Sequence, residues 1–112
     1  MLKLIDKYII VTTLCDNEKV KDEIIDNLLE KHLVAGSQTT KVHSKYYWHG
    51  RLEETNEYKI EFRTKEKYFD KIKEEILKYH DYELPEISYI EMKGTKEILK
   101  WIDDETAQKK AC

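Results

Sequence analysis

The sequence predicts a single α+β domain in which a four-stranded antiparallel sheet carries two helices, with a third helix at the end of the chain. Three observations support this fold class. Hydrophobic residues alternate along the chain between the period of a strand and the period of a helix. The length of 112 residues suits one domain, because domains typically contain about 100–150 residues. The charge is nearly balanced, with 20 basic and 23 acidic residues, which argues against intrinsic disorder.

The first predicted strand covers residues 8–14, a nearly continuous run of β-branched and aromatic side chains. Asp16 or Asn17 then provides an N-cap for a helix. In that helix, apolar residues recur at helical spacing over residues 20–33, while lysine and glutamate occupy the other face. Gly36 suits the end of the helix or the turn that follows it.

A long hairpin is predicted next, with strands at about Gln38–Trp48 and Leu52–Arg63 and a turn at His49-Gly50-Arg51. Apolar and charged residues alternate in its second strand, which indicates one buried and one solvated face. Strands of about 11 residues, at about 3.3 Å each, reach roughly 36 Å. A compact domain of this length has a diameter of about 34 Å, so we expect the hairpin to span the domain or overhang it.

The second half of the chain repeats the pattern of helix and strand. Thr64 is predicted to cap a helix whose apolar stripe covers residues 69–79. An irregular passage, His80–Glu86, contains the single proline, and Ile87–Met92 is the fourth strand. Gly94-Thr95 opens a short last helix. The residues of that helix expected to face inward are Ile98, Trp101 and Ile102.

The order is therefore β-α-β-β-α-β followed by a helix, which is the split βαβ or ferredoxin-like arrangement. In this arrangement both main helices lie on one face of the sheet, so the other face needs a different cover. We expect one domain over residues 1–112, with its core at about 7–105 and a frayed polar tail at about 106–112.

Three consecutive aromatic residues, Tyr46-Tyr47-Trp48, lie near the tip of the predicted hairpin. Their rings either pack on the last helix of the same subunit or reach a neighbouring subunit. We favour the second interpretation, because aromatic residues are enriched in interface cores. An oligomer would also cover the bare sheet face and the edge strands, which a monomer must protect in other ways.

Composition excludes several classes of protein and partner. Only Arg51 and Arg63 are arginine, the residue preferred for phosphates and base edges, so we expect no nucleic-acid partner. The longest apolar stretch, residues 8–14, is far shorter than the roughly 20 residues of a membrane-spanning helix, so we expect no membrane partner. Cys15 and Cys112 lie at opposite ends of the chain, which favours free thiols in a reducing compartment. We therefore expect a cytoplasmic protein.

The sequence offers no catalytic residues, and we expect no enzymatic activity. It contains neither a glycine-rich phosphate loop nor a serine in a nucleophile elbow. Its adjacent acidic residues are interpreted as solvated faces; these are Glu53-Glu54, Glu74-Glu75 and Asp103-Asp104-Glu105. His43 and His49 share a strand face but lie roughly 20 Å apart, so they could meet at one metal ion only across subunits.

Two features could carry chemistry. Cys15 lies between a strand and a helix N-terminus, a position that can lower the pKa of a thiol, although such a cysteine is more often a small buried hydrophobe. The passage His80–Glu86 places an imidazole, three carboxylates and a phenol on a loop stiffened by proline. Its acidic residues either hold the entry to the fourth strand or bind a ligand, and the residues alone favour the structural role.

The same passage resembles a known family. His80-Asp81-Tyr82-Glu83-Leu84-Pro85-Glu86-Ile87 is similar to the H-x-Y-E-x-P-E-I segment of the CutA family, the divalent-cation tolerance proteins. Ser44–Gly50 resembles the S-x-Y-x-W-x-G hairpin of that family. The resemblance covers about residues 7–105, and the rest agrees in order and spacing. The further matching segments are Ile9–Thr13, Leu33–Ala35, Glu57 with Phe62–Thr64, and Leu99–Ile102.

This resemblance implies a tight homotrimer, similar in architecture to the PII signalling proteins, that is associated with tolerance of divalent metals such as copper. A protein of this kind requires no cofactor, but it could hold copper or zinc in the cleft between its subunits. The metal candidates that follow are His80, Glu83, Glu86 and Cys15. The residues expected at the trimer interface are Tyr46, Tyr47, Trp48, Tyr82 and Pro85.

One departure from the family pattern concerns the metal. Many members have a cysteine just after the Leu-x-Ala of the second strand, whereas this chain has Gly36-Ser37. The loss of a thiolate weakens a Cu(I) site, because thiolates select that ion. The alternative function is a PII-like sensor or interaction scaffold, in which lysines and Arg63 would hold a small anion in the cleft between subunits.

Overall fold

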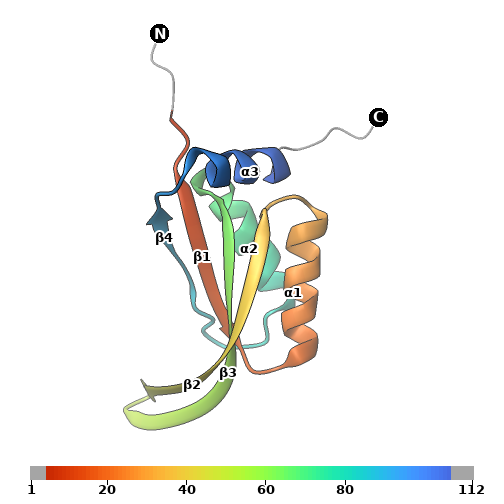
Figure 1. The fold of residues 1–112 in the computed structure, drawn as a ribbon. Helices are drawn as coiled ribbons and strands as arrows, with labels where there is room; N and C mark the ends of the chain where they lie inside the picture. The colour runs from red at the N-terminus through yellow and green to blue at the C-terminus, as the bar shows by residue number, and fades with distance from the viewer. Residues whose placement is uncertain (1–4, 107–112) are drawn as a thin grey trace.

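A computed structural model describes residues 5–106 of the chain and confirms the predicted order of elements (Figure 1). The sheet has the order β2-β3-β1-β4, and every neighbouring pair of strands is antiparallel. The elements are β1 (Tyr8–Cys15), α1 (Glu18–Glu30), β2 (Gly36–Trp48), β3 (Arg51–Lys65), the 3₁₀ turn η1 (Glu66–Tyr68), α2 (Phe69–Tyr79), β4 (Ile87–Met92) and α3 (Lys96–Thr106).

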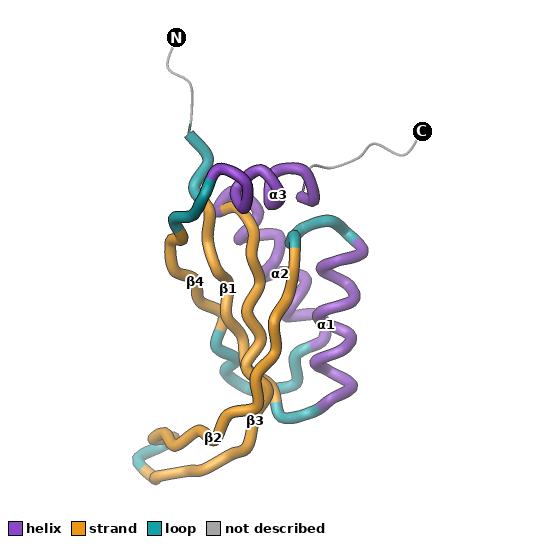
Figure 2. Tube along the Cα trace, viewed as in Figure 1, coloured by secondary structure: helices purple, strands orange, loops and turns teal. Residues whose placement is uncertain are grey.

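Helices α1 and α2 cover one face of the sheet and form the core with it (Figure 2). Alternate residues of β1 point to this face, as the strand period of two requires, and Ile9 and Val11 are fully buried there. Phe62 of β3 lies opposite Val11 in the register. The helices contribute the buried side chains Val20, Ile24, Leu28, Ile72 and Ile76.

The opposite face of the sheet is only partly covered. Ile10 on β1 lies opposite Ile90 on β4, and Ile90 is 65% exposed. Strands β2 and β4 form the two edges of the sheet. The predicted bare face and open edges are therefore present in a single subunit.

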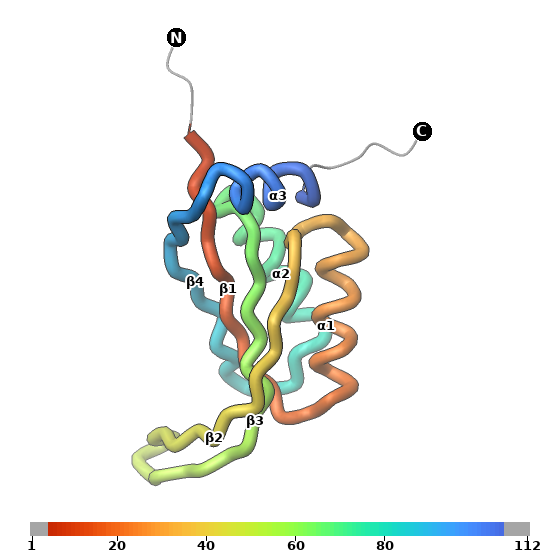
Figure 3. The backbone as a smooth tube through the Cα atoms, in the orientation of Figure 1, coloured from red at the N-terminus to blue at the C-terminus, as the bar shows by residue number. Residues whose placement is uncertain are grey.

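The hairpin of β2 and β3 overhangs the rest of the subunit, as predicted. The turn residues His49 and Gly50 both have positive φ, at 51° and 77°, which fits the two-residue turn that matches the twist of a hairpin. The subunit measures 52 × 30 × 24 Å, and its radius of gyration of 15.4 Å exceeds the roughly 13 Å of a compact domain of this length. We call the overhanging part, residues 43–56, the hairpin arm; Figure 3 shows it leaving the body.

The rings near the tip cannot reach the last helix of their own subunit. That helix packs at the other end of β2, where a Cβ added to Gly36 would lie 2.8 Å from the ring of Trp101. Trp48 is the last residue of the same strand, which places it roughly 40 Å away. The interpretation in which Tyr46-Tyr47-Trp48 pack on the last helix is therefore wrong, and Gly36 is required for the close approach of Trp101.

Two predicted helix ends differ from those in the structure. Asn17 is the N-cap of α1, as predicted, and its side chain accepts a hydrogen bond from the Val20 amide at 3.0 Å. The helix ends at Glu30, where His32 with φ 55° turns the chain, so Gly36 does not end it. Thr64 does not cap α2, because β3 continues through it and its hydroxyl donates to the carbonyl of Leu33 at 2.6 Å.

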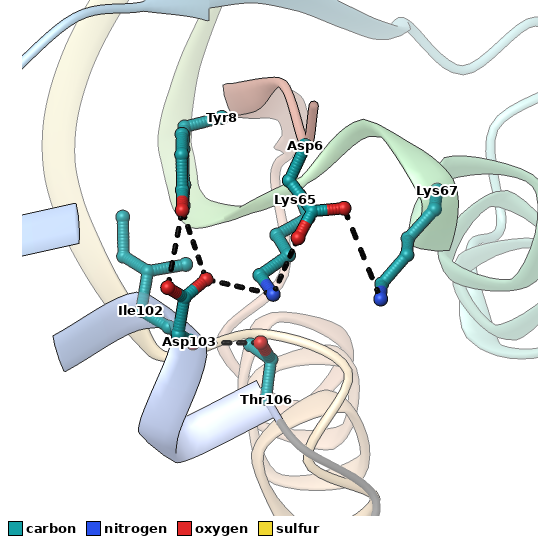
Figure 4. Close-up of polar contacts among 7 residues, drawn as sticks. All are labelled: Asp6, Tyr8, Lys65, Lys67, Ile102, Asp103 and Thr106. Atoms are coloured by element: carbon teal, nitrogen blue, oxygen red, sulfur yellow. Dashed lines mark hydrogen bonds and ion pairs between the residues drawn. The ribbon is translucent and has the colours of Figure 1, made fainter. Parts of the chain in front are cut away.

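A polar network attaches α3 to the end of the sheet (Figure 4). The Tyr8 hydroxyl donates to the carboxylate of Asp103 at 2.9 Å, and Lys65 Nζ lies 2.7 Å from Asp103 and 3.1 Å from Asp6. Asp103 therefore does not belong to a solvated acidic face, contrary to the prediction.

The last described turn of α3 also differs from the prediction. Thr106 is buried, and its hydroxyl donates to the carbonyl of Ile102 at 2.6 Å, so the frayed tail cannot begin at this residue. Residues 107–112 of the predicted tail lie outside the described residues. Of the side chains expected to face inward, Ile102 is buried, whereas Ile98 and Trp101 are 39% and 38% exposed.

Glu75 does not lie on a solvated face, so the prediction from its sequence context is wrong. Its side chain is 1% exposed. The amide of Asn27 and the ammonium groups of Lys31 and Lys78 each donate to its carboxylate at 2.7 Å. These hydrogen bonds lower the pKa of Glu75 to about 2 and tie α1 to α2.

Candidate functional site

A pocket of about 850 Å³ lies between the hairpin arm and the loop that joins α2 to β4. It is lined by the end of β1, by both strands of the arm and by residues 81–84 and 86 of the loop. Antiparallel pairing explains this meeting of distant segments, because β1 ends beside the start of β4. The loop that leads into β4 therefore lies against residues that follow β1.

His80 fastens this loop to the body of the subunit. Its Nε2 lies 2.6 Å from the carbonyl oxygen of Leu14, and its Nδ1 lies 3.2 Å from the amide nitrogen of Tyr82. A carbonyl only accepts and an amide only donates, so Nε2 carries the hydrogen and the lone pair of Nδ1 meets the amide. In this arrangement the ring has no lone pair left for a metal ion.

Tyr82 ties the loop to the base of the hairpin arm. Its hydroxyl donates to Oε2 of Glu57 at 2.7 Å, and Glu57 is only 9% exposed. Burial, the hydrogen bond to Glu57 and the charge of that carboxylate all raise the pKa of Tyr82. The phenol therefore stays protonated and acts as a fixed donor in the wall of the pocket.

The pocket is strongly acidic. Its five carboxylates belong to Asp16, Glu57, Asp81, Glu83 and Glu86. None of them forms an ion pair with a basic side chain in the part of the chain that the structure describes. The basic lining residues are Lys45 and His43, whose side-chain nitrogens lie 3.2 Å and 3.7 Å from a carboxylate oxygen of Glu54. The charge of the pocket is therefore uncompensated.

The acidic side chains do not converge on one point. Among residues 5–106, no group of three His, Cys, Asp or Glu side chains lies close enough together to hold a metal ion. Glu86 is partly engaged as well, because its Oε2 accepts a hydrogen bond from the Ser88 hydroxyl at 2.9 Å. A metal bound by one subunit would have few direct protein ligands and would keep several waters.

The remaining predicted metal candidate, Cys15, does not line the pocket, although its neighbours Leu14 and Asp16 do. It is fully buried in the core, and its thiol donates to the carbonyl of Asn17 at 3.7 Å. Burial raises the pKa of the thiol, because it disfavours the charged thiolate. The interpretation of Cys15 as a small buried hydrophobe is therefore confirmed. The alternative interpretation, an exposed thiolate with a lowered pKa, is wrong.

Three of the five predicted interface residues form the outer wall of the pocket. Tyr46, Tyr47 and Trp48 line it from the arm, and Tyr47 is 78% exposed. The hydroxyl of Tyr46 lies 2.9 Å from Oγ1 of Thr55 on the paired strand, which fixes this ring. Tyr82 lines the pocket from the loop, as described above, whereas Pro85 is half-buried and lies outside it.

Sequence reasoning missed Asp16 and Glu57 as parts of the site. The sequence context of Asp16 indicates only a helix cap, and Glu57 stands out only as part of the family pattern. A signal for Asp16 was available, since the predicted topology already places the residue after the first strand beside the loop before the fourth. No local signal marks the burial of Glu57, because it follows the charged parity of its strand.

Comparison with known proteins identifies the family of the chain and tests its fold. The family model described as CutA1 divalent ion tolerance protein matches residues 9–105. The chain belongs to this family. The divalent-cation tolerance protein CutA of Pyrococcus horikoshii is 31% identical over 99 residues, which cover 88% of this chain and 96% of that protein. The CutA protein of Thermotoga maritima is 32% identical over 95 residues, covering 84% and 94%.

Solved CutA structures share the fold. The periplasmic divalent cation tolerance protein CutA from Archaeoglobus fulgidus superposes with a TM-score of 0.85 at 27% identity and covers 88% of this chain and 98% of its own. The Cut A1 protein from Thermus thermophilus also gives a TM-score of 0.85, at 28% identity, covering 89% and 99%. The ferredoxin-like fold class is therefore confirmed. Among the described helices, none is long and apolar enough to cross a membrane.

Proposed function

We propose that the protein contributes to divalent-cation tolerance by binding divalent cations in the acidic pocket, as a homotrimer without enzymatic activity. The observation that carries this proposal is the set of five pocket carboxylates without a basic partner in the described chain. Such a concentration of negative charge raises the local concentration of cations. Family membership also supports a role in divalent-cation tolerance, because relatives are named divalent-cation tolerance proteins.

Glu83 and Glu86 are the ligands that fit best among the predicted metal candidates, because both line the pocket. His80 supports them indirectly by holding the loop in place. A divalent ion such as copper or zinc would complete its coordination with groups of an adjacent subunit or with water. Cu(I) fits less well, because it requires soft ligands and the thiol of Cys15 is buried in the core.

The absence of enzymatic activity in this proposal is supported by the chemistry of the pocket. A general base needs a pKa near the working pH, and enzymes obtain it by shifting carboxylates upward or lysines downward. The strong shift in the pocket is that of Tyr82, whose pKa is raised. A phenol that holds its proton more tightly is a hydrogen-bond donor rather than a base.

Three features of the subunit support assembly. The arm exposes Tyr46 and Tyr47, which are 41% and 78% exposed. The sheet face opposite the helices exposes Ile90, and the edges β2 and β4 carry unpaired backbone groups. A homotrimer in which each arm lies on a neighbour would cover all three.

The acidic pocket argues against the alternative of a small-anion sensor. Five carboxylates against one lysine and one histidine repel an anion at this position. A PII-like sensor of this chain would have to bind its anion elsewhere.

We place the protein in the cytoplasm, where a free thiol such as Cys15 persists. The related protein from Archaeoglobus fulgidus is described as periplasmic, so the compartment of the native protein should be determined by cell fractionation.

Calorimetric titration of Cu²⁺ and Zn²⁺ into the native protein tests the binding of metal. We expect binding by the wild type and binding weakened by about tenfold in Glu83→Gln/Glu86→Gln, since each lost charge removes a few-fold of affinity. The matched control is Glu30→Gln/Glu97→Gln, which makes the same change in charge on exposed helix residues outside the pocket. Absence of heat with the wild type, or equal weakening in both variants, would refute the assignment of the pocket.

A further inference from the structure

We infer that Glu61 of one copy forms an ion pair with Arg63 of the next copy across the open face of the sheet, which is the face opposite α1 and α2. This ion pair rests on the homotrimer proposed above, because it exists only between copies. Two observations carry it: the distribution of charge on the open face, and a guanidinium group that has no partner within the described subunit.

The strand register identifies the side chains of the open face. On β1 the alternate residues that lie under the helices are buried, so Ile10 and Thr12 point to the open face. Arg63 of β3 is paired with Ile10, and Glu61 is paired with Thr12. Directly paired residues point to the same side of a sheet. Both charged side chains therefore lie on the open face, two positions apart on one strand.

The neighbours of these two residues on the open face are uncharged. Each charged residue belongs to a row of paired residues that crosses the sheet. The rows are Gly36, Arg63, Ile10 and Ile90, and Gln38, Glu61, Thr12 and Ser88. Ile90 is 65% exposed in the single subunit. An adjacent copy that covers this isoleucine also removes water from the two charges beside it.

Neither charge is neutralised within the described part of the subunit. Over residues 5–106, Arg63 and Glu61 form no ion pair, and Nη1 of Arg63 is buried without a hydrogen-bond partner. Lys65, the next residue of β3 on this face, differs because its Nζ lies 2.7 Å from Asp103. An unpaired charge is strongly destabilising once water is excluded from it. Burial of the open face therefore requires a counter-charge for both residues.

A second copy of the chain supplies these counter-charges. The open face of β3 carries a carboxylate at Glu61 and basic groups at Arg63 and Lys59, so it is complementary in sign to its own copy. Another carboxylate of β3, that of Glu57, is already engaged by the Tyr82 hydroxyl. In a closed ring, each copy gives its carboxylate to one neighbour and receives a carboxylate from the other, so every copy is satisfied in the same way.

Arg63 is a better partner for Glu61 than Lys59 is. A guanidinium group can hold a carboxylate through two parallel hydrogen bonds, which fixes the orientation as well as the distance. The flexible chain of Lys59 can carry its ammonium group to water at the rim of an interface. Charged pairs of this kind set the register of an interface and select its partner. The pair therefore determines how two copies face each other.

Reversal of each charge provides the first test. Arg63→Glu creates an open face with two neighbouring carboxylates, and Glu61→Arg creates one with two neighbouring guanidinium groups. We expect each variant alone to shift to smaller species on dilution, at concentrations where the wild type keeps its mass, because like charges would meet in the interface. Light scattering coupled to size exclusion measures the mass. Wild-type mass in both variants would overturn the inference.

A mixture of the two variants distinguishes a contact between copies from a contact within one chain. Each variant chain carries like charges at both positions, so it cannot form the pair internally, whereas its face complements that of the other variant. We expect an equimolar mixture to recover larger species that contain both chains, identified by native mass spectrometry. Such recovery also shows that both variants are folded. A mixture that keeps the masses of the separate variants would overturn the inference.

Lys19→Glu and Glu30→Arg are the matched controls. They make the same changes in charge at exposed residues of α1, which covers the other face of the sheet. We expect both controls to keep the wild-type mass at every concentration tested. If the controls lose mass as Arg63→Glu and Glu61→Arg do, net charge explains the effect and the ion pair is refuted.

The homotrimer and the ion pair fail separately in these experiments. A wild-type mass of 13.5 kDa at micromolar concentration would refute the homotrimer and the ion pair with it. A wild type of three times that mass, with charge-reversal variants that behave like the controls, would refute the ion pair alone. The metal titrations described above depend on Glu83 and Glu86 of the loop, and their outcome is independent of this pair.

Discussion

His80 shows how a hydrogen-bond pattern decides the role of a residue. Its sequence context, an imidazole beside three carboxylates, makes it an attractive metal ligand. In the fold, both ring nitrogens are used within the subunit, one against the Leu14 carbonyl and one against the Tyr82 amide. The residue therefore positions the acidic loop, and the carboxylates of that loop remain available to a cation.

The buried carboxylate of Glu75 stabilises the fold through its three hydrogen bonds. We expect Glu75→Gln to lower the free energy of unfolding by about 2 kcal/mol at pH 7, because a buried group loses charge-assisted hydrogen bonds. The exposed neighbouring residue provides the control, since Glu74→Gln makes the same chemical change without a buried partner. Urea denaturation of the three proteins measures the difference.

The pH dependence of that difference follows from the pKa. Glu75 has a pKa of about 2 in the folded protein, against 4.5 for an ordinary glutamate. Its contribution is therefore fully present above about pH 4.5 and is lost as the pH falls towards 2. The gap between the wild type and Glu75→Gln should narrow between pH 5 and about pH 2.5. A gap that stays constant over this interval would contradict the ion-pair interpretation.

Buried polar residues are the part of the structure that sequence reasoning could not supply. Glu75 receives a hydrogen bond from Asn27, 48 positions away, and Asp103 receives one from Tyr8, 95 positions away. Periodicity describes only which face of its own element a residue occupies. A charged residue on a polar face becomes buried when a distant element covers that face, and no local pattern records this.

Elements, in contrast, could be predicted well. The bounds of β4 agree with the prediction, and the strands of the hairpin extend only two residues beyond it at each outer end, to Gly36 and Lys65. Alternating and helical periods are strong signals in this chain because lysine and glutamate occupy many of the solvated positions of its helices and strands. The site was predicted in part: its loop was identified, whereas its other walls depend on strand pairing.

The loop between α2 and β4 is held to the body of the subunit by His80. We expect His80→Ala to lower the free energy of unfolding by about 2 kcal/mol and to speed amide exchange at Tyr82, because two hydrogen bonds that hold the loop are lost. His43→Ala is the matched control, since the side chain of His43 is 55% exposed and its Nε2 lies 3.7 Å from the exposed carboxylate of Glu54. Thermal unfolding and hydrogen exchange measure both effects. Equal behaviour of the two variants would show that His80 does not hold the loop.

The whole molecule presents surfaces that one subunit leaves open. The arm makes the subunit 52 Å long, with aromatic residues near its tip, and the sheet face opposite α1 and α2 is partly apolar. Lysine and glutamate cover much of the remaining surface. Assembly would therefore convert an extended subunit into a compact particle and would enclose the acidic pocket between neighbours.

The interfacial role of the arm can be separated from packing within the subunit. Trp48 lies near the tip of the arm, whereas Trp101 packs over Gly36 in its own subunit. We expect Trp48→Ala to shift the protein towards smaller species on dilution, and Trp101→Ala to retain the wild-type mass at the same concentrations. Equal loss of mass in both variants would argue against an interface at the arm.

Light scattering coupled to size exclusion tests assembly most directly, because every surface argument above depends on it. The subunit mass is 13.5 kDa, and the account predicts a particle of three times that mass at micromolar concentration. A mass of 13.5 kDa under the same conditions would contradict it.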